Sequence, residues 1–317
     1  MNILAQHLID GQCCSYRQVN DKKNPELLRN IRFEAIKTFV TQSDIQDFDI
    51  LNIQEVGPLD QELMASVLDF LNEQDNKYAY TTSQKPTGAQ QLKCATIHNN
   101  KKLQELNVDS LLIMKKEKVN QFGYFQTFRH REAQKLFVNC NLHLSGGKTE
   151  EDRLTRQTQL NLIRDHPIWK DNYPIILGGD MNTEIEELVK LVKEVREELQ
   201  YIHTAETLYN SENRIQSRNR DGWNGTQVVQ RTVDGLFFTG MNLLSVMRAV
   251  ENFSDLINQD KISKVEDLLK EIETSQDTDK KNALNDECWN IIKGDELGFP
   301  SAIWYSDHVP IGAVFQL

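Results

Sequence analysis

The stretch from Tyr173 to Asn182 reads Tyr-Pro-Ile-Ile-Leu-Gly-Gly-Asp-Met-Asn. Its apolar part has the length of a buried strand. Two glycines end that run, and glycine allows a sharp turn or a close approach of the backbone to a ligand. Asp180 and Asn182 follow, two residues apart. The stretch therefore predicts a strand that delivers a carboxylate and an amide to its carboxyl end, although an ordinary turn aspartate fits the same letters.

A helix is predicted directly after this strand. Thr183 and Glu186 have the spacing of a capping box, in which two side chains satisfy the first backbone N–H groups of a helix. One apolar stripe at helical spacing continues from there: Ile185, Leu188, Val192, Val195 and Leu199. Asp180 and Asn182 should then lie on the tight connection between a buried strand and a helix.

Composition restricts the class of protein. The chain has 317 residues, a net charge of −11 and five cysteines. This length suits one large domain or two modest ones. The acidic total gives no general attraction for nucleic acid, so a polyanion would have to meet a local patch. The cysteines have no CxxC spacing, which fits a reduced intracellular protein.

Targeting signals are not evident in the sequence. The first residues lack the continuous apolar core of a signal peptide. No stretch approaches the roughly 18 apolar residues that a membrane helix needs. We therefore expect a protein of the cytoplasm, or of the nucleus, without membrane insertion.

Strands and helices alternate early in the chain, and strands dominate later. Helices are predicted at Pro25–Val40, after Pro58 and at Asp152–Arg164. Met1–Leu8 resembles the end of a strand, and further strands are predicted at Phe48–Ile53, Ser110–Met114, Phe122–Phe128, Lys135–Leu142, Thr232–Phe238 and Val309–Phe315. Thr81–Gln91 and Asn210–Gln230 are polar and predict loops. Two amphipathic helical patterns between Ile262 and Ile292 predict a helical insertion at about 255–298. We expect this pair of helices to pack on the outside of the sheets. The mixture favours packed sheets with helices outside, in a single catalytic domain over residues 1–317.

Polar residues stand at the ends of the predicted strands. They are Asn2, Glu55, Asn141, His143, Asp180, Asn182, Asp307 and His308, with Asp234 inside a further strand. Singly, each fits a structural role, such as a surface charge or a satisfied core histidine. Together, carboxylates and amides suit Mg²⁺, which prefers oxygen ligands. Zinc-ligand spacing, a Gly-x-Ser-x-Gly elbow and phosphate-binding glycine motifs are all missing from the sequence. Carboxylates, amides and histidines around a hard metal ion indicate phosphoester hydrolysis by activated water.

Five blocks follow one another along the chain: Asn2–Gln6, Gln54–Val56, Asn141–Leu144, Gly179–Asn182 and Ser306–His308. In this order they resemble the endonuclease/exonuclease/phosphatase superfamily, and Thr232–Asp234 resembles a sixth block. The first block is similar to nocturnin and the deadenylase-type 3′–5′ exoribonucleases. The resemblance implies an α/β fold, a four-layer sandwich of two packed mixed β-sheets flanked by helices.

The resemblance also implies a metal site and a water-activating group. Glu55, helped by Asn2 and with Asp307 nearby, would hold Mg²⁺, for which Mn²⁺ is a possible substitute. Asp180 would orient or deprotonate the attacking water. Asn182 would stabilise the charged state that follows.

Further roles concern the phosphate and the substrate. His143 and His308 would contact the scissile phosphate, and Asp234 would pair with His308. Asn141, Arg153 and Arg156 are candidate substrate-binding residues, although the spacing of the arginines differs from that in relatives. Leu92-Lys93 stands where deadenylases have Asp-Gly, which leaves substrate contacts there open.

The leading hypothesis is a Mg²⁺-dependent phosphodiesterase, a 3′–5′ exoribonuclease acting on RNA tails. Candidate RNA contacts are Lys115, Lys116, Lys118, Arg214, Arg218, Arg220 and Trp223, because stacking and local positive charge hold single strands; solvated loop charges explain them equally well. One alternative is a phosphatase for a nucleotide 2′-phosphate or an inositol phosphate. Another is an inactive binding module that keeps the fold.

Overall fold

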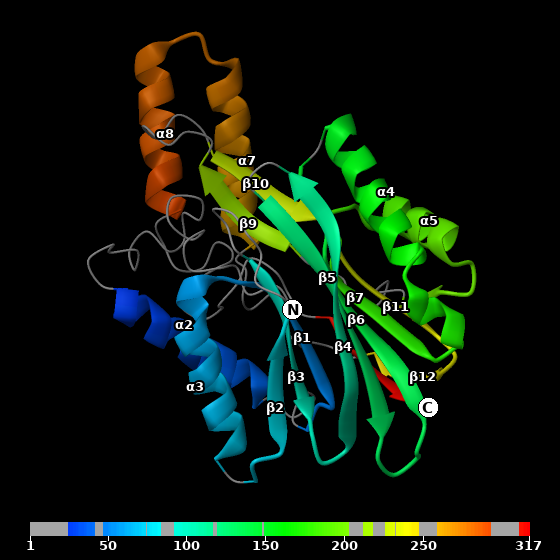
Figure 1. Cartoon of the computed structure of the whole chain (residues 1–317). Helices are drawn as coiled ribbons and strands as arrows, with labels where there is room; N and C mark the ends of the chain where they lie inside the picture. The colour runs from blue at the N-terminus through cyan, green and yellow to red at the C-terminus, as the bar shows by residue number, and fades with distance from the viewer. Residues whose placement is uncertain are drawn as a thin grey trace.

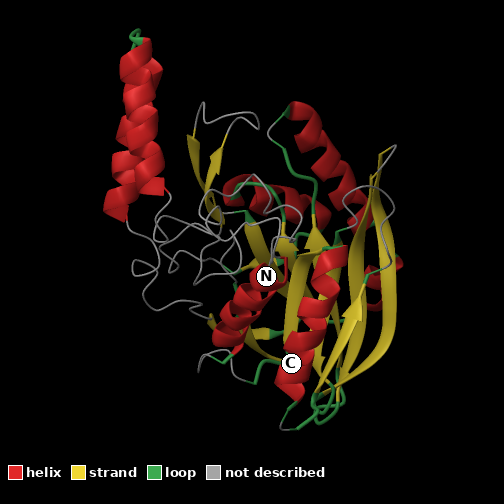
Figure 2. Cartoon of the chain, turned by 90° about the vertical axis from the view of Figure 1, so that its left-hand side faces the viewer, coloured by secondary structure: helices red, strands yellow, loops and turns green. Residues whose placement is uncertain are grey.

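The computed structural model of the chain has four layers (Figure 1). Two β-sheets face each other. Helices α2 (Pro25–Val40) and α3 (Gln61–Asn72) lie on the outer side of one sheet, and α4 (Glu150–Arg164) and α5 (Ile185–Val195) lie on the outer side of the other. Figure 2 shows the same arrangement from the side, with strands between helices. The predicted four-layer sandwich is confirmed.

The structure describes residues 25–41, 47–73, 75–83, 92–116, 119–147, 149–202, 212–217, 226–231, 233–246, 259–292 and 311–317. The predictions for Asn2, Asp307 and His308 lie outside these ranges. Within them, no helix has both the length and the apolar character to span a membrane.

The larger sheet has six strands in the order β4-β5-β6-β7-β11-β8. In that order their bounds are Leu103–Lys116, Val119–His130, Leu136–His143, Ile175–Asp180, Asp234–Thr239 and Gln200–Tyr201. β6 and β7 run parallel, and the other neighbouring pairs are antiparallel. A parallel pair needs a crossover connection, and α4 provides it. The carboxyl ends of β6 and β7 therefore meet at one edge of the sheet.

The smaller sheet has the order β1-β3-β2, with bounds Ile50–Val56, Lys93–Asn99 and Tyr78–Thr82. Its described strands are all antiparallel, so only the larger sheet is mixed. The pairing of β1 with β3 is irregular between Ile53 and Val56. Such a β-bulge disrupts the ladder and re-aims the side chains next to it.

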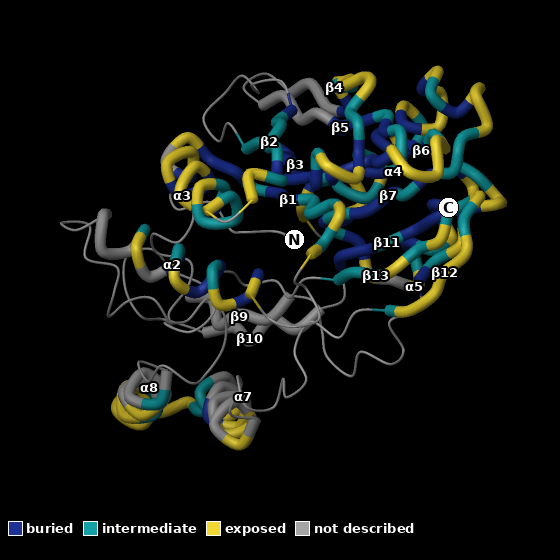
Figure 3. Tube along the Cα trace, turned by 90° about the horizontal axis from the view of Figure 1, so that it is seen from below, coloured by how far each residue is buried: buried dark blue, intermediate teal, exposed yellow. Residues whose placement is uncertain are grey.

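The main apolar core lies between the larger sheet and helices α4 and α5. On β6, Val138, Cys140 and Leu142 alternate into this core and are fully buried. Burying one aliphatic side chain completely stabilises a fold by about 1.5–3 kcal/mol. Burial also raises the pKa of the Cys140 thiol, so this cysteine packs as an apolar residue and is no nucleophile. Figure 3 shows the buried strands between helices whose outer sides are exposed.

Helices α7 (Gln259–Thr274) and α8 (Thr278–Ile292) form a hairpin, which confirms the two predicted helices. We expected this pair to pack on the outside of the sheets, and that expectation is wrong. The hairpin stands away from both sheets, beside the two-stranded ribbon of β9 (Glu212–Ser217) and β10 (Thr226–Arg231) (Figures 1 and 2). The ribbon itself occupies most of the segment predicted as a polar loop.

The predicted capping box before α5 is wrong. The N-cap of α5 is Glu184, and the Thr183 hydroxyl donates to the Met181 carbonyl at 3.0 Å instead. The helix ends at Val195, four residues before the predicted end. A capping box does open α4, where Thr149 and Asp152 bond each other's backbone N–H groups.

Several strands have no counterpart among the predictions: β2, β3 and β12 (Asn242–Val246), which pairs with β13 (Ala313–Gln316). β3 is buried along nearly its whole length. A strand covered on both faces loses the alternation of apolar and polar residues that marks a half-buried strand. β4 and β5 are both longer than predicted, because their polar ends also join the ladder.

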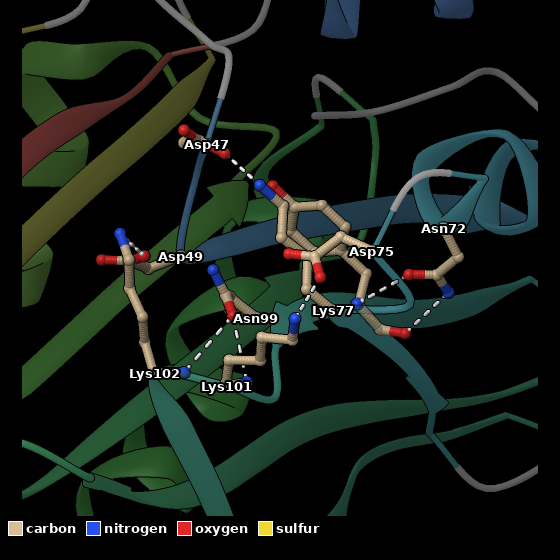
Figure 4. A network of polar contacts seen from close by, with 9 residues as sticks. Asp47, Asp49, Asn72, Asp75, Lys77, Asn99, Lys101 and Lys102 are labelled. Carbon is tan, nitrogen blue, oxygen red and sulfur yellow. Dashed lines mark hydrogen bonds and ion pairs between the residues drawn. The ribbon is translucent and has the colours of Figure 1, made fainter.

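A network of polar contacts lies on the surface around the amino-terminal end of β1 (Figure 4). Lys77 pairs with Asp47, Lys101 with Asp75, and the Asn99 side chain accepts from the backbone of the following turn. Exposed ion pairs of this kind stabilise by at most about 1 kcal/mol. The network lies at the opposite end of β1 from Glu55, roughly 20 Å away at the rise of a strand. Its residues therefore supply control positions that are remote from Glu55.

Candidate active site

Three predicted site residues stand on adjacent strands at one edge of the larger sheet. His143 ends β6 and Asp180 ends β7, and the two are register partners in the parallel pair. Asp234 begins β11 and is the register partner of Asp180 on its other side. The topology of the sheet therefore gathers two carboxylates and an imidazole at one edge.

Glu55 joins them from the smaller sheet. It lies in the irregular stretch of β1, with a backbone φ of 60°. A positive φ is uncommon for a residue other than glycine, asparagine or aspartate. The unusual backbone sends the Glu55 side chain across the space between the sheets toward β6.

Glu55, His143 and Asp180 form what we call the carboxylate–histidine cluster. His143 Nε2 lies 3.6 Å from Glu55 Oε1 and 3.6 Å from Asp180 Oδ2. One ligand atom from each residue lies within 4.8 Å of the other two. The side chains are 12% (Glu55), 14% (His143) and 2% (Asp180) exposed. The cluster is thus largely shielded from water, yet Glu55 and His143 remain accessible to a ligand.

Asp180 is held in place by the turn that follows it. The backbone N–H of Asn182 donates to Asp180 Oδ1 at 2.9 Å. Asn182 itself has φ of 49°, a left-handed conformation that asparagine tolerates better than most residues. Its side-chain amide donates to the Leu144 carbonyl at 2.9 Å, which ties the turn to the loop after β6. Asp180 Oδ2, the other oxygen, faces His143.

The donor set of the cluster fits a hard divalent cation. Mg²⁺ is commonly held in proteins through one or two carboxylates, with water and substrate phosphates completing its shell. Two carboxylates placed together in a shielded position repel each other, and a cation between them offsets that repulsion. Glu55 and Asp180 are two such carboxylates, and they lie together in a shielded position. His143 can serve as a further ligand or as a donor to a bound phosphate.

Helix α4 holds the loop that follows His143. Arg156 Nη1 donates to the carbonyls of Ser145 and Gly147 at 3.1 and 3.0 Å, and Gln159 Oε1 accepts from the Ser145 backbone at 2.9 Å. Arg156 is 5% exposed. The structure therefore shows this predicted substrate-binding residue in contact with the loop carbonyls. The other predicted arginine, Arg153, is on the surface of α4 and pairs with Glu150.

Asn141 is also removed from the cluster surface. Its side chain is fully buried between the two sheets. Asn141 lies two residues before His143, on the same face of β6. Among the candidate RNA contacts, Lys118, Arg218, Arg220 and Trp223 lie outside the described residues, as do the side chains of Lys115, Lys116 and Arg214.

Sequence reasoning missed the amides that surround the cluster, above all Gln54, Asn52 and Asn139. They line the interface between the sheets. The signal was available: on β6, the residues between the apolar positions are Asn139, Asn141 and His143. When polar residues occupy every second position of a strand and apolar residues the positions between them, the polar face of that strand is expected to contact other polar side chains.

Comparison with known proteins places the fold. No protein-family model and no curated protein sequence matches the chain. Solved structures do match. ANGEL2, described as a 2′,3′-cyclic phosphatase, superposes with a TM-score of 0.62 at 18% identity over 99% of this chain and 93% of its own. The human Nocturnin catalytic domain gives 0.52 at 19% identity over 78% and 83%. An endonuclease/exonuclease/phosphatase from Bacteroides vulgatus gives 0.51 at 14% identity over 68% and 82%.

These comparisons identify the fold. The chain has the fold of the endonuclease/exonuclease/phosphatase superfamily, as the ordered sequence blocks predicted. ANGEL2 matches along nearly the full length of both chains, so the likeness includes more than the central sheets.

Proposed function

We propose that this protein is a divalent-metal-dependent phosphodiesterase that hydrolyses a phosphoester at the 3′ end of RNA. One observation carries the proposal: Glu55, His143 and Asp180 come from three strands and two sheets to within 4.8 Å of one another. A purely structural role does not call for two carboxylates and an imidazole at the solvent edge of a sandwich. Carboxylates and a histidine gathered in one place are candidates for a general base and for phosphate-contacting groups.

Each residue of the cluster has a step to perform. Asp180 Oδ2 accepts a proton from the attacking water while the water oxygen forms its bond to phosphorus. Asn182 keeps the other oxygen of Asp180 occupied through its backbone N–H, which directs Oδ2 at the water. His143 donates a hydrogen bond to a phosphate oxygen. A phosphorus–oxygen bond then breaks, the leaving oxygen takes up a proton from the surrounding water, and Asp180 releases its proton to the solvent.

Glu55 would hold Mg²⁺ or Mn²⁺ beside Asp180, with Asn2 and Asp307 as further predicted ligands. When bound, such an ion supplies positive charge to the phosphate and lowers the pKa of a bound water. The roles predicted for His308, as a phosphate contact, and for Asp234, as its partner, belong to the same proposal. Asp234 adjoins Asp180 in the sheet, which is compatible with that role.

The choice of an RNA end as the substrate is supported by the structural relatives. ANGEL2 is described as a 2′,3′-cyclic phosphatase and also in complex with adenosine-2′,3′-vanadate. Because this likeness spans both chains, a 2′,3′-cyclic phosphate is our first candidate. The second is the last internucleotide bond of a tail, as in a deadenylase-like 3′–5′ exoribonuclease, favoured by the Asn2–Gln6 resemblance and the likeness to Nocturnin. Both bonds are phosphodiesters at a 3′ end.

A substrate panel separates these candidates. Wild-type protein with Mg²⁺ is incubated with four compounds: oligo(A) ending in a 2′,3′-cyclic phosphate, oligo(A) with a free 3′-hydroxyl, a nucleotide 2′-phosphate and an inositol phosphate. We expect loss of the cyclic phosphate to be the fastest reaction. Mononucleotide release from the 3′-hydroxyl oligonucleotide would establish the exoribonuclease instead. Turnover of the two small monoesters alone would contradict an RNA substrate, and inertness toward all four would support a binding module.

We also propose that the α7–α8 hairpin is an accessory insertion in one catalytic domain. It stands beside the β9–β10 ribbon and contributes no residue to the carboxylate–histidine cluster. We therefore assign the chemistry to the sandwich alone.

A further inference from the structure

The two sheets meet through amide side chains near the carboxylate–histidine cluster. Asn52 of β1 and Asn139 of β6 exchange two hydrogen bonds of 2.8 Å, each amide donating to the other's oxygen. One step closer to the cluster, Gln54 Nε2 donates to Asn141 Oδ1 at 2.7 Å. Buried amides are costly unless they are hydrogen-bonded, so these pairs fix the register of one sheet against the other.

Asn141 does more than pair with Gln54. Its Nδ2 donates to two backbone carbonyls of the opposite sheet, that of Ile53 on β1 at 3.2 Å and that of Ala95 on β3 at 2.8 Å. The side chain is fully buried. A single side chain of β6 thus bonds both strands of the β1–β3 pair and a side chain of β1.

The two carbonyls border the irregular stretch of β1. Ile53 and Ala95 are the last regular partners before it, and Val56 pairs with Lys93 after it. Three residue steps on β1 therefore match two on β3, and Glu55 lies inside the interval with φ of 60°. A bulge disrupts the ladder, and a left-handed glutamate persists only where surrounding contacts hold it. The Asn141 amide supplies such contacts at the base of the bulge.

We propose that Asn141 is a positioning residue that holds the β1 bulge in the conformation that aims Glu55 at His143 and Asp180. This role rests on the proposed function. It replaces the substrate-binding role predicted for Asn141, because both kinds of amide atom are engaged inside the protein and the side chain is shielded from any substrate. Asn141 acts through Glu55 and touches no reacting atom.

Asn139 provides a matched control for the test. It is the same residue type on the same face of the same strand, two residues before Asn141, and it is also fully buried. Its amide bonds the side chains of Asn52 and Gln126 and no carbonyl of the bulge. Loss of either asparagine amide should lower the unfolding temperature, whereas only loss of Asn141 should release Glu55.

The experiment compares wild type, Asn141→Ala and Asn139→Ala in thermal unfolding, in Mn²⁺ binding by the protein alone, and in hydrolysis of the best compound of the substrate panel. Partners that orient a metal ligand typically contribute about 10–100-fold to affinity or activity. We expect Asn141→Ala to lose about that factor in both Mn²⁺ affinity and kcat, and Asn139→Ala to stay within about threefold of wild type. Gln54→Met removes only the hydrogen bond to Asn141 Oδ1 and should weaken Mn²⁺ binding by a smaller factor. This variant replaces Asn141→Ala in the test if Asn141→Ala does not fold.

Three outcomes would overturn the role of Asn141 while leaving the proposed function intact. A folded Asn141→Ala with wild-type Mn²⁺ affinity and kcat would show that the bulge needs no support from this amide. Equal losses of Mn²⁺ affinity and kcat in Asn139→Ala would mean that the losses in Asn141→Ala come from general disruption of the interface between the sheets. If Asn141→Ala does not fold, a Gln54→Met variant with wild-type Mn²⁺ affinity would argue against the role. Wild type that binds no Mn²⁺ and hydrolyses none of the panel would instead overturn the proposed function, and this role with it.

Discussion

Replacing Gly179 with alanine should destabilise the fold severely, by at least about 4 kcal/mol, the range that point substitutions reach only through a defined steric or electrostatic conflict. Gly179 has φ of +142°, and a Cβ there would lie 2.0 Å from the Leu142 carbonyl oxygen. That oxygen belongs to the backbone of β6, so no side-chain rotation can relieve the clash. Thermal and denaturant unfolding of the purified variant would measure the loss.

The neighbouring glycine is the control for this prediction. A Cβ at Gly178 would meet the flexible Leu236 Cδ1 at 3.0 Å and the Gly235 carbonyl oxygen at 3.3 Å, contacts that small shifts relieve, and the backbone there is not left-handed. Gly178→Ala should therefore cost only about 1 kcal/mol, as an ordinary substitution does. Equal unfolding midpoints for the two variants would contradict the close parallel packing of β6 and β7 beside Asp180.

Asp180→Asn should abolish turnover in a protein that remains folded. Asparagine keeps the shape of the side chain and can still accept the Asn182 backbone N–H, so the turn should survive. It cannot take a proton from water, and a positioned general base contributes about 10²–10⁴-fold to rate. Steady-state hydrolysis of the best panel substrate, with circular dichroism as the check on folding, measures both effects.

Asp75→Asn is the matched substitution for that experiment. Asp75 pairs with Lys101 at the surface, in the network at the far end of the smaller sheet (Figure 4). Its loss should leave kcat and kcat/KM unchanged. A folded Asp180→Asn variant with near-normal hydrolysis would remove Asp180 from the chemistry.

Much of the fold could be predicted from the sequence because its strongest signals are local. The apolar stripe of α2 and the buried run of β7 both produced the expected elements. β3 escaped prediction because it is covered on both faces and shows no alternation. The capping box at Thr183 failed since the same hydroxyl found the Met181 carbonyl, a competition that spacing alone does not reveal.

The same contrast between local signals and long-range contacts holds for the candidate site. Glu55, His143 and Asp180 lie at or near the carboxyl ends of their strands, and they were predicted by their position in ordered motifs. The sequence also singled out Asn141 and Arg156, but it could not show which partner each side chain takes. Their hydrogen bonds go to backbone carbonyls of a neighbouring sheet or loop. Such contacts depend on how separate segments pack, and they leave no spacing signature in the chain.

The most direct test of the central claim is hydrolysis of the 2′,3′-cyclic phosphate oligonucleotide by metal-stripped wild type and Glu55→Gln protein over a series of Mg²⁺ concentrations. We expect no turnover after treatment with EDTA and recovery on addition of Mg²⁺. Glu55→Gln should require more Mg²⁺ and reach a lower kcat, because an amide oxygen is a weaker ligand than a carboxylate. Full activity of the stripped wild type, or an unchanged Mg²⁺ requirement in folded Glu55→Gln, would contradict a metal-dependent site built on Glu55, His143 and Asp180.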